Sequence, residues 1–282
     1  MKEKYEKRLA LLGLMPFIVL VVAFLFGPLL TMIIMSIQKT GGGGFSLEQY
    51  KEIFTNLFYI QSFKNSITLS LVASIISIII CSITAYFITK LSQKTQDMVL
   101  NLSNLTNNFS GVPLAFAFMI MLGNSGVFII LAKKFGVEIL MNFNLYSWAG
   151  LLLMYVYFQI PLGVMLLFPT LQGIKEELKQ AAFLLGASSF EFWRYVGLPI
   201  ILPGIVGVFS ILFANAMGAY ASAYALVGSN YNLLTVQIGG LISGDIFSRT
   251  ELASAIAVVL AIILILALLL NDFMMKKVRR GI

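Results

Sequence analysis

The sequence has no histidine, a single cysteine and few charged residues among its 282 positions. Without histidine, the chain has no His-based acid–base catalyst, no histidine metal ligand and no Ser-His nucleophile pair. With one cysteine, thiolate metal clusters and intramolecular disulfides are excluded too, and we expect Cys81 to be a small buried apolar residue. These absences argue against an enzyme and leave no metal site to predict.

The low content of charged residues indicates a protein that lies in a lipid bilayer. Only 11% of its residues are charged, against about a quarter in soluble domains, and 59% are hydrophobic. Long continuous apolar runs, rather than short alternating segments, favour helices over a barrel. We therefore predict an all-α integral membrane protein with six transmembrane helices. The six uncharged stretches are Leu9 to Ile37, Ser66 to Thr89, Met98 to Leu122, Leu145 to Phe168, Leu198 to Tyr224 and Leu252 to Asn271.

Basic residues predict the orientation, since they collect in the cytoplasmic segments of membrane proteins. With both termini cytoplasmic, that side receives most of the 19 Lys and Arg residues. The net charge of +7 is then a topology signal and a contact with anionic lipid, not a nucleic-acid footprint. The residues on that side are Lys2, Lys4, Lys7, Arg8, Lys90, Lys94, Lys175, Lys179, Arg194, Lys276, Lys277, Arg279 and Arg280.

The six stretches hold no carboxylate, and ion-coupled transporters depend on such groups inside the membrane. If the protein moves a solute uphill, we expect the energy to come from a partner. A stand-alone channel or secondary transporter is an alternative that this absence disfavours. An intramembrane enzyme would need a catalytic dyad or metal site that the spans do not offer.

Polar residues in the fifth stretch are candidates for lining a pathway. Asn215, Tyr220, Ser222 and Tyr224 are expected in one helix, and their amide and hydroxyl groups can hydrogen-bond a solute or a neighbouring helix. The two tyrosines lie four residues apart and should share a face, which also suits anchoring at the membrane interface. Pro161 and Pro169 in the fourth stretch are expected to kink it, for gating or with no functional meaning.

The loop over residues 171–197 is longer than a simple connector and predicts two short helices. Phe183 falls among charged residues of the first helix, so it is a candidate plug for a partner's groove. The alternative is a surface helix that only covers the base of the bundle. The residues expected to lie against that base are Ile174, Leu178, Ala181, Ala182 and Leu185.

Local signals define the ends of those two helices. Gly186 predicts a helix stop, and Ser188 with Glu191 three residues later predicts a capping box that starts the second helix, Ser189 to Val196. We expect Leu198-Pro199 to end that helix and to open the fifth span.

The outer segments contain little regular structure by pattern. The run Thr40 to Gly44 predicts a flexible joint, and Phe45 to Phe58 could form a short interfacial helix. The loops Gly123 to Asn144 and Ala225 to Glu251 are expected to be irregular.

The 171–197 loop resembles the cytoplasmic motif of permeases from binding-protein-dependent ATP-binding-cassette (ABC) importers. That motif reads Glu-Ala-Ala, three residues, Gly, nine residues, Ile, one residue, Leu-Pro. Here the spacing is held by Gln180-Ala181-Ala182, Gly186, Val196 and Leu198-Pro199. Gln180 departs from the usual Glu, which puts charge pairing with an ATPase in doubt. The resemblance covers about residues 60–275 and points most to the branch for polyamines, iron, thiamine and phosphonates.

The resemblance implies one transmembrane permease domain over residues 1–282, with its core at about 60–275, an extra N-terminal helix at 9–37 and a coupling loop at 171–197. Its ATPase-coupling residues would be those named in the loop, from Gln180 to Pro199. It implies a multi-pass protein of a bacterial cytoplasmic membrane, with two ATPases, an extracellular solute-binding protein and a second permease subunit as partners, and it favours a different chain as that second subunit. ATP and Mg would be bound by the ATPases, leaving no cofactor in this chain. The expected solute is polyamine-like or phosphonate/thiamine-like; a sugar importer is the alternative, and an exporter half is disfavoured by the short inner loops.

Overall fold

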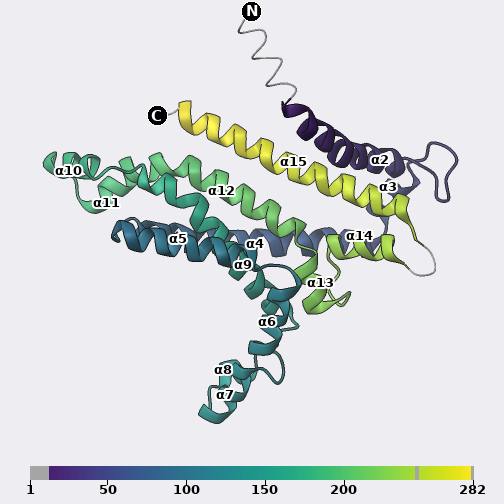
Figure 1. Ribbon diagram of the computed structural model, residues 1–282, viewed down its shortest axis with the longest axis horizontal. Helices are drawn as coiled ribbons and strands as arrows, with labels where there is room; N and C mark the ends of the chain where they lie inside the picture. Colours follow the sequence, from purple (N-terminus) through teal and green to yellow (C-terminus); the bar gives the residue numbers. More distant parts are fainter. Residues whose placement is uncertain (1–12, 245–247, 281–282) are drawn as a thin grey trace, which may run out of the picture. The chain divides into compact units, whose positions relative to one another are not determined.

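The computed structural model describes residues 13–244 and 248–280, and the side chains of that region up to Phe273 (Figure 1). Within these residues the chain is helical, with no strand beyond an isolated bridge between Gln38 and Phe45. Six segments are long and apolar enough to span a membrane, as predicted. The termini's orientation stays a prediction, and the basic residues before position 13 lie outside the described residues. The spans are Gly13–Ser36, Leu57–Ile88, Val112–Phe135, Trp148–Gln172, Ser189–Gly218 and Thr250–Phe273.

The chain divides into two compact units, each described here by itself. The first contains residues 1–60 and 237–262, with η1 (Val22–Phe26), α2 (Gly27–Ser36), α3 (Glu48–Thr55), most of α14 (Leu234–Ser243) and the start of α15 (Thr250–Arg280). Helix α3 confirms the short helix expected between Phe45 and Phe58.

Polar contacts fix the segment between α2 and α3. Gly41 to Gly44 all have positive φ, from 84° to 127°, a region that only glycine adopts without strain. The Gly41 N–H donates to Glu251 at 3.1 Å. Arg249 makes a two-pronged ion pair with Glu52, in which Nη1 lies 2.8 Å from Oε1, and this hydrogen bonding raises the pKa of Arg249. The predicted joint is therefore bonded to Glu251 through Gly41, and α3, which follows it, is bonded to Arg249 through Glu52.

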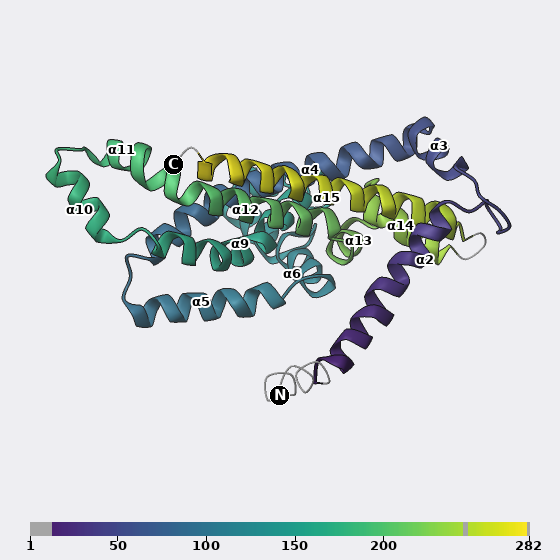
Figure 2. The same cartoon turned by 90° about the horizontal axis from the view of Figure 1, so that it is seen from above.

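The second unit holds residues 61–236 and 263–282, and its centre is formed by α4 (Leu57–Ile88), α9 (Trp148–Gln172) and α12 (Leu198–Gly218), with α5 (Gln93–Asn108) along α9 (Figures 1 and 2). Buried serines on α4 bond to two different segments: Ser74 and Ser77 to α9, and Ser62 and Ser66 to residues 232–234. The buried serines are Ser62, Ser66, Ser70, Ser74 and Ser77.

Hydroxyl and thiol groups of α4 bond to α9 around its first proline. Ser77 Oγ donates to the Val156 carbonyl at 3.4 Å, and Cys81 Sγ to the Ile160 carbonyl at 3.3 Å. Cys81 is fully buried, as expected. Pro161 lies inside an unbroken helix, so neighbouring groups absorb its effect on the backbone.

The third predicted span is wrong as one helix from Met98 to Leu122. The chain leaves the helix after Asn108 and turns at Gly111, whose φ of 73° needs glycine, before α6 (Val112–Leu122) begins with Pro113 in its first turn. The outer loops are not irregular either. They contain α7 (Val127–Phe135), α8 (Glu138–Met141) and α14, whose apolar residues were hidden among turn-forming ones.

Candidate functional site

The first helix of the 171–197 loop is α10 (Glu176–Leu184), and it ends at the predicted glycine. Gly186 has φ of 86°, its N–H donates to the Phe183 carbonyl at 3.0 Å, and the Ala187 N–H donates to the Ala182 carbonyl at 3.0 Å. This pair of bonds is the Schellman arrangement that closes a helix with a left-handed residue. The helix stop is confirmed, together with the tight turn that follows it.

The second helix starts with the predicted capping box. The Glu191 N–H donates to Ser188 Oγ at 3.3 Å, and the Ser188 N–H donates to the Glu191 carboxylate at 2.7 Å. The two exchanged bonds satisfy two backbone donors at the start of α11 (Ser189–Phe192). Ser188 and Glu191 therefore act locally, on the shape of the turn.

The expected end of that helix at Leu198-Pro199 is wrong, because the helix runs on into α12 through the π-helical turn η2 (Trp193–Gly197). The Leu198 N–H bonds to the Trp193 carbonyl five residues back, and Pro199 has no N–H to donate. The Trp193 ring lies over Gly197, where an added Cβ would come within 2.7 Å of it. The loop is thus joined rigidly to the fifth span.

Helix α10 stands away from the bundle, contrary to the expected packing of its apolar face. None of its residues is buried. Leu178 is 41% exposed and Leu185 89% exposed, so those two do not cover the base of the bundle. The motif residues Gln180 and Ala181 are exposed, and Ala182 is half-buried. Apolar side chains are thus widely exposed on this one loop.

Phe183 is only partly available as a plug. Its side chain is 41% exposed, its ring centre lies 6.4 Å from that of Phe192, and the Lys179 ammonium lies 5.5 Å from it. The more exposed apolar side chain is Leu184, at 89%. Leu184 was not predicted as exposed, because only Phe183 was singled out among the charged residues of this helix.

An ion pair joins α10 to the end of α4. Lys90 Nζ lies 3.1 Å from Glu176 Oε2, and the hydrogen bond from Lys90 lowers the pKa of Glu176. Lys179 lies 4.0 Å from the same carboxylate. Nearby, the Gln96 side-chain amide donates to the Leu91 carbonyl at 2.9 Å, in the turn between α4 and α5. The sequence gives no signal for contacts between residues 86 positions apart.

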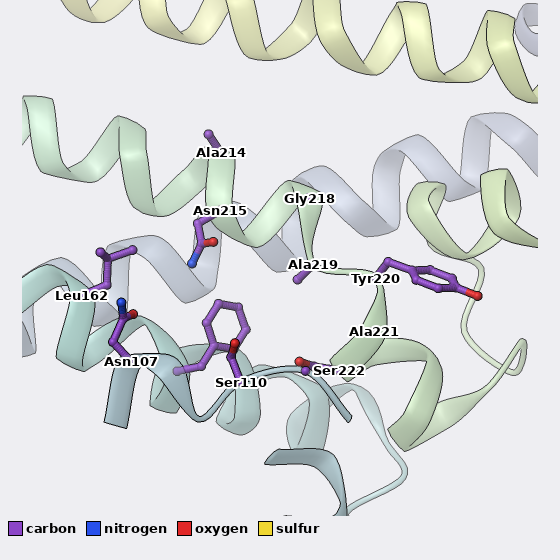
Figure 3. A pocket seen from close by; sticks show the side chains of 12 residues that line it. Asn107, Ser110, Leu162, Ala214, Asn215, Gly218, Ala219, Tyr220, Ala221 and Ser222 are labelled. Carbon is purple, nitrogen blue, oxygen red and sulfur yellow. The ribbon is translucent and has the colours of Figure 1, made fainter. Parts of the chain in front are cut away.

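A cavity of about 650 Å³ opens in the second unit at the C-terminal end of α12 and the break that follows it (Figure 3). In Figure 3 the amides of Asn107 and Asn215 point toward one another, with Ser110 and Ser222 on the same side. Ser222 is 5% exposed. In the part of the chain that the structure describes, these four side chains make no hydrogen bond to other residues. Asn215 and Ser222 were predicted as pathway residues, whereas Asn107 and Ser110 were missed inside the broken third stretch.

The tyrosines of the fifth stretch follow a helix break that was not predicted. Helix α12 ends at Gly218, Tyr220 lies in the break, and α13 (Ala221–Val227) carries Ser222 and Tyr224, so the four predicted residues do not share one helix. The Tyr220 and Tyr224 rings stack with centres 5.4 Å apart and an angle of 18°, so they do share a face. Tyr220 borders the cavity, whereas Tyr224 is not among the residues that line it.

The cavity offers hydrogen bonds without charge. Its lining side chains are amides, hydroxyls and apolar groups, and none of the described lining residues is charged. Within the described residues, no group of three His, Cys, Asp or Glu side chains could hold a metal ion. The arrangement can bind and release a polar solute, but it offers no catalytic group.

Comparison with known proteins identifies the family to which the chain belongs. A family model described as "Binding-protein-dependent transport system inner membrane component" matches residues 83–282. The chain belongs to this family. It is a permease subunit of an ABC importer, a multi-pass inner-membrane component that translocates rather than hydrolyses ATP. The predicted class, fold and membrane location are thereby confirmed.

Relatives differ in their stated solutes. The spermidine/putrescine permease PotC of Haemophilus influenzae is 24% identical over 88% of this chain and 92% of its own. A probable sulfate permease, cysT of Chlorella vulgaris, is 30% identical over 62% of this chain, which spans 63% of that relative.

Solved structures share the fold. A bacterial ABC transporter "involved in the import of the acidic polysaccharide alginate" matches 98% of both chains with a TM-score of 0.75 and 18% identity. The MetNI methionine ABC transporter matches 78% of this chain and 95% of its own, with a TM-score of 0.59 and 17% identity.

Proposed function

We propose that this chain forms half of a translocation pathway with a second permease subunit, that two cytoplasmic ATPases drive the pair, and that the 171–197 loop is where this chain engages the ATPases. An extracellular binding protein would deliver the solute, and ATP and Mg would be held by the ATPases. The observation that carries the proposal is the exposed α10, closed by Gly186 and joined through an unbroken helix to α12. We call residues 171–197 the coupling loop from here on.

Coupling follows from this continuity. When the ATPases close on ATP, a push on α10 would pass through the capping box and the π turn into α12. Helix α12 carries Asn215 beside the cavity, so its tilt changes the pathway directly. Gln180 is exposed on α10 and uncharged, so docking here would rely on shape and apolar contact rather than on a carboxylate.

Two independent observations bear on the chemical class of the solute. The names of the PotC relatives favour a polyamine-like solute, with phosphonate- or thiamine-like solutes next and a sugar as the alternative. The cavity offers amide and hydroxyl oxygens that can accept hydrogen bonds from ammonium groups. It contains no carboxylate among its described residues, so for a polyamine the second permease would have to supply the negative charge.

The docking proposal is tested by Ala182→Arg in permease reconstituted with its partners. A long charged side chain at this half-buried position should prevent docking and abolish both ATPase co-purification and transport-coupled hydrolysis. Gln93→Arg adds the same charge at an exposed position at the start of α5 and serves as the matched control. Unchanged coupling in Ala182→Arg would refute the proposal.

The solute is tested separately by a thermal-shift screen of the cognate binding protein. The panel contains polyamines, thiamine, phosphonates, ferric complexes and sugars. A shift with sugars alone would contradict the favoured solutes and support the alternative.

A further inference from the structure

We propose that the Lys90–Glu176 ion pair is a second mechanical link of the coupling loop, which passes its movement to α4 as well as to α12. The proposal rests on the proposed function, since it assumes that ATPases push on α10. The two residues are positioning residues: they would set the angle of α10 and would touch neither ATP nor solute.

The attachment of α10 makes this pair important. None of its residues is buried; the Phe183 ring packs on Phe192 of α11, and the Lys179 ammonium lies beside the Phe183 ring and the Glu176 carboxylate within α10. The Glu176 carboxylate joins α10 to the segment that follows α4, through an ion pair with Lys90, which lies two residues past the end of that helix. Figures 1 and 2 agree that α10 lies at the far end of the second unit, where few other contacts can restrain it.

The surroundings hold Lys90 in place. Its ammonium lies 5.6 Å from the centre of the Tyr86 ring, and Tyr86 packs edge-on against Trp193 with centres 5.2 Å apart. Trp193 belongs to the π turn that opens α12. These groups enclose a space of about 20 Å³, enough for one water molecule. Lys90 therefore connects the last turn of α4, the first turn of α10 and the base of α12.

The strength of the pair suits a movable link. The Lys90 and Glu176 side chains are 45% and 57% exposed, so water screens their attraction. An exposed ion pair of this kind contributes little to fold stability. The same small free energy can nevertheless shift an equilibrium between two positions of the loop by roughly two- to fivefold. We therefore expect effects on coupling and not on folding.

A charge swap tests the link in the reconstituted complex with its ATPases and binding protein. The readout is the ratio of binding-protein-stimulated to basal ATP hydrolysis. Lys90→Glu and Glu176→Lys should each lower this ratio by roughly two- to fivefold, and the double swap should restore it. The matched control combines Lys90→Glu with Glu177→Lys, which has the same composition but places the new lysine at an exposed position one residue away, and it should not restore the ratio.

Three outcomes would overturn the proposal: single variants with an unchanged ratio, a swap that fails to restore it, or restoration by the Glu177 control. Co-purification of the ATPases separates this proposal from the proposed function. Both single variants should retain their ATPases, and their loss from these variants would assign the pair to assembly instead of transmission. Normal coupling in Ala182→Arg would instead refute docking on the loop itself.

Discussion

Replacing Gly163 with alanine tests how closely α4 and α9 pack. An added Cβ would lie 2.5 Å from Cys81 Sγ, 3.2 Å from Cys81 Cβ and 3.4 Å from a Leu212 methyl. Cys81 and Leu212 are fully buried, so the sulfur has little room to move. Overpacking of this kind costs about 1–3 kcal/mol, whereas Gly to Ala inside a helix gains up to about 1 kcal/mol. We expect Gly163→Ala to destabilise the protein by up to about 2 kcal/mol.

Cys81→Ala removes the obstructing sulfur and should reverse this loss. Alone, it leaves a small void that costs about 1 kcal/mol. In Gly163→Ala/Cys81→Ala the closest contact becomes the 3.2 Å approach of two Cβ atoms, which a small shift relieves. The loss of unfolding free energy in the double variant should therefore be smaller, by about 1–3 kcal/mol, than the sum of the losses in the two single variants.

Thermal unfolding of the purified permease in detergent, at a fixed heating rate, measures the order of these variants. Gly204→Ala is the matched control, because its Cβ would meet Thr170 at 2.5 Å instead of Cys81. Cys81→Ala should not rescue it. If the stability losses of Gly163→Ala and Cys81→Ala simply add in the double variant, the Cys81 sulfur is not what opposes a Cβ at Gly163.

Three further predictions concern the coupling loop and the orientation. Gly186→Val forces a β-branched residue to φ of 86° and should uncouple hydrolysis from transport; Gly136→Val, at φ of 70° after α7, carries similar strain and should not. Lys39→Cys should react with an impermeant maleimide from outside the cell, and Ser92→Cys should react with it from inside. Labelling of both cysteines from one side would contradict the topology, and buried Cys81 should give no background. Because Lys90 lowers the pKa of Glu176 below its ordinary 4.5, the contribution of the pair is present above that pH and is lost as pH falls through the lowered value. The coupling ratio of the wild type relative to Glu176→Gln should thus stay constant from about pH 5.5 to 8, and a change within that range would refute the assignment.

Local signals of the sequence predicted local structure well. Gly186, Ser188 and Glu191 act within a few residues of themselves, so their spacing was sufficient to predict the helix stop and the capping box. Long apolar runs likewise predicted the helical spans, because lipid leaves the backbone no alternative.

Tertiary features were missed where the signal is not local. The break at Gly111 and the one before Tyr220 lie in uncharged sequence, so the absence of charge carried the predicted spans across both, although α5 is rich in Asn, Ser and Thr. As a result Asn107 was not recognised beside Asn215, although the fold brings both to one cavity. The exposure of Leu185 could not be predicted either, because apolar periodicity does not distinguish a face covered by the same chain from one left for a partner.

The π turn from Trp193 to Gly197 has a consequence for how the chain tolerates insertions and deletions. A π turn holds one residue more than an α turn, and each residue in an α-helix adds about 100° of rotation and 1.5 Å of rise. Deleting one residue between Trp193 and Gly197 would therefore leave α12 in place but turn the coupling loop about its axis by about 100°. The number of residues in this turn sets the direction in which the loop faces, so its length should be far less variable than its side chains.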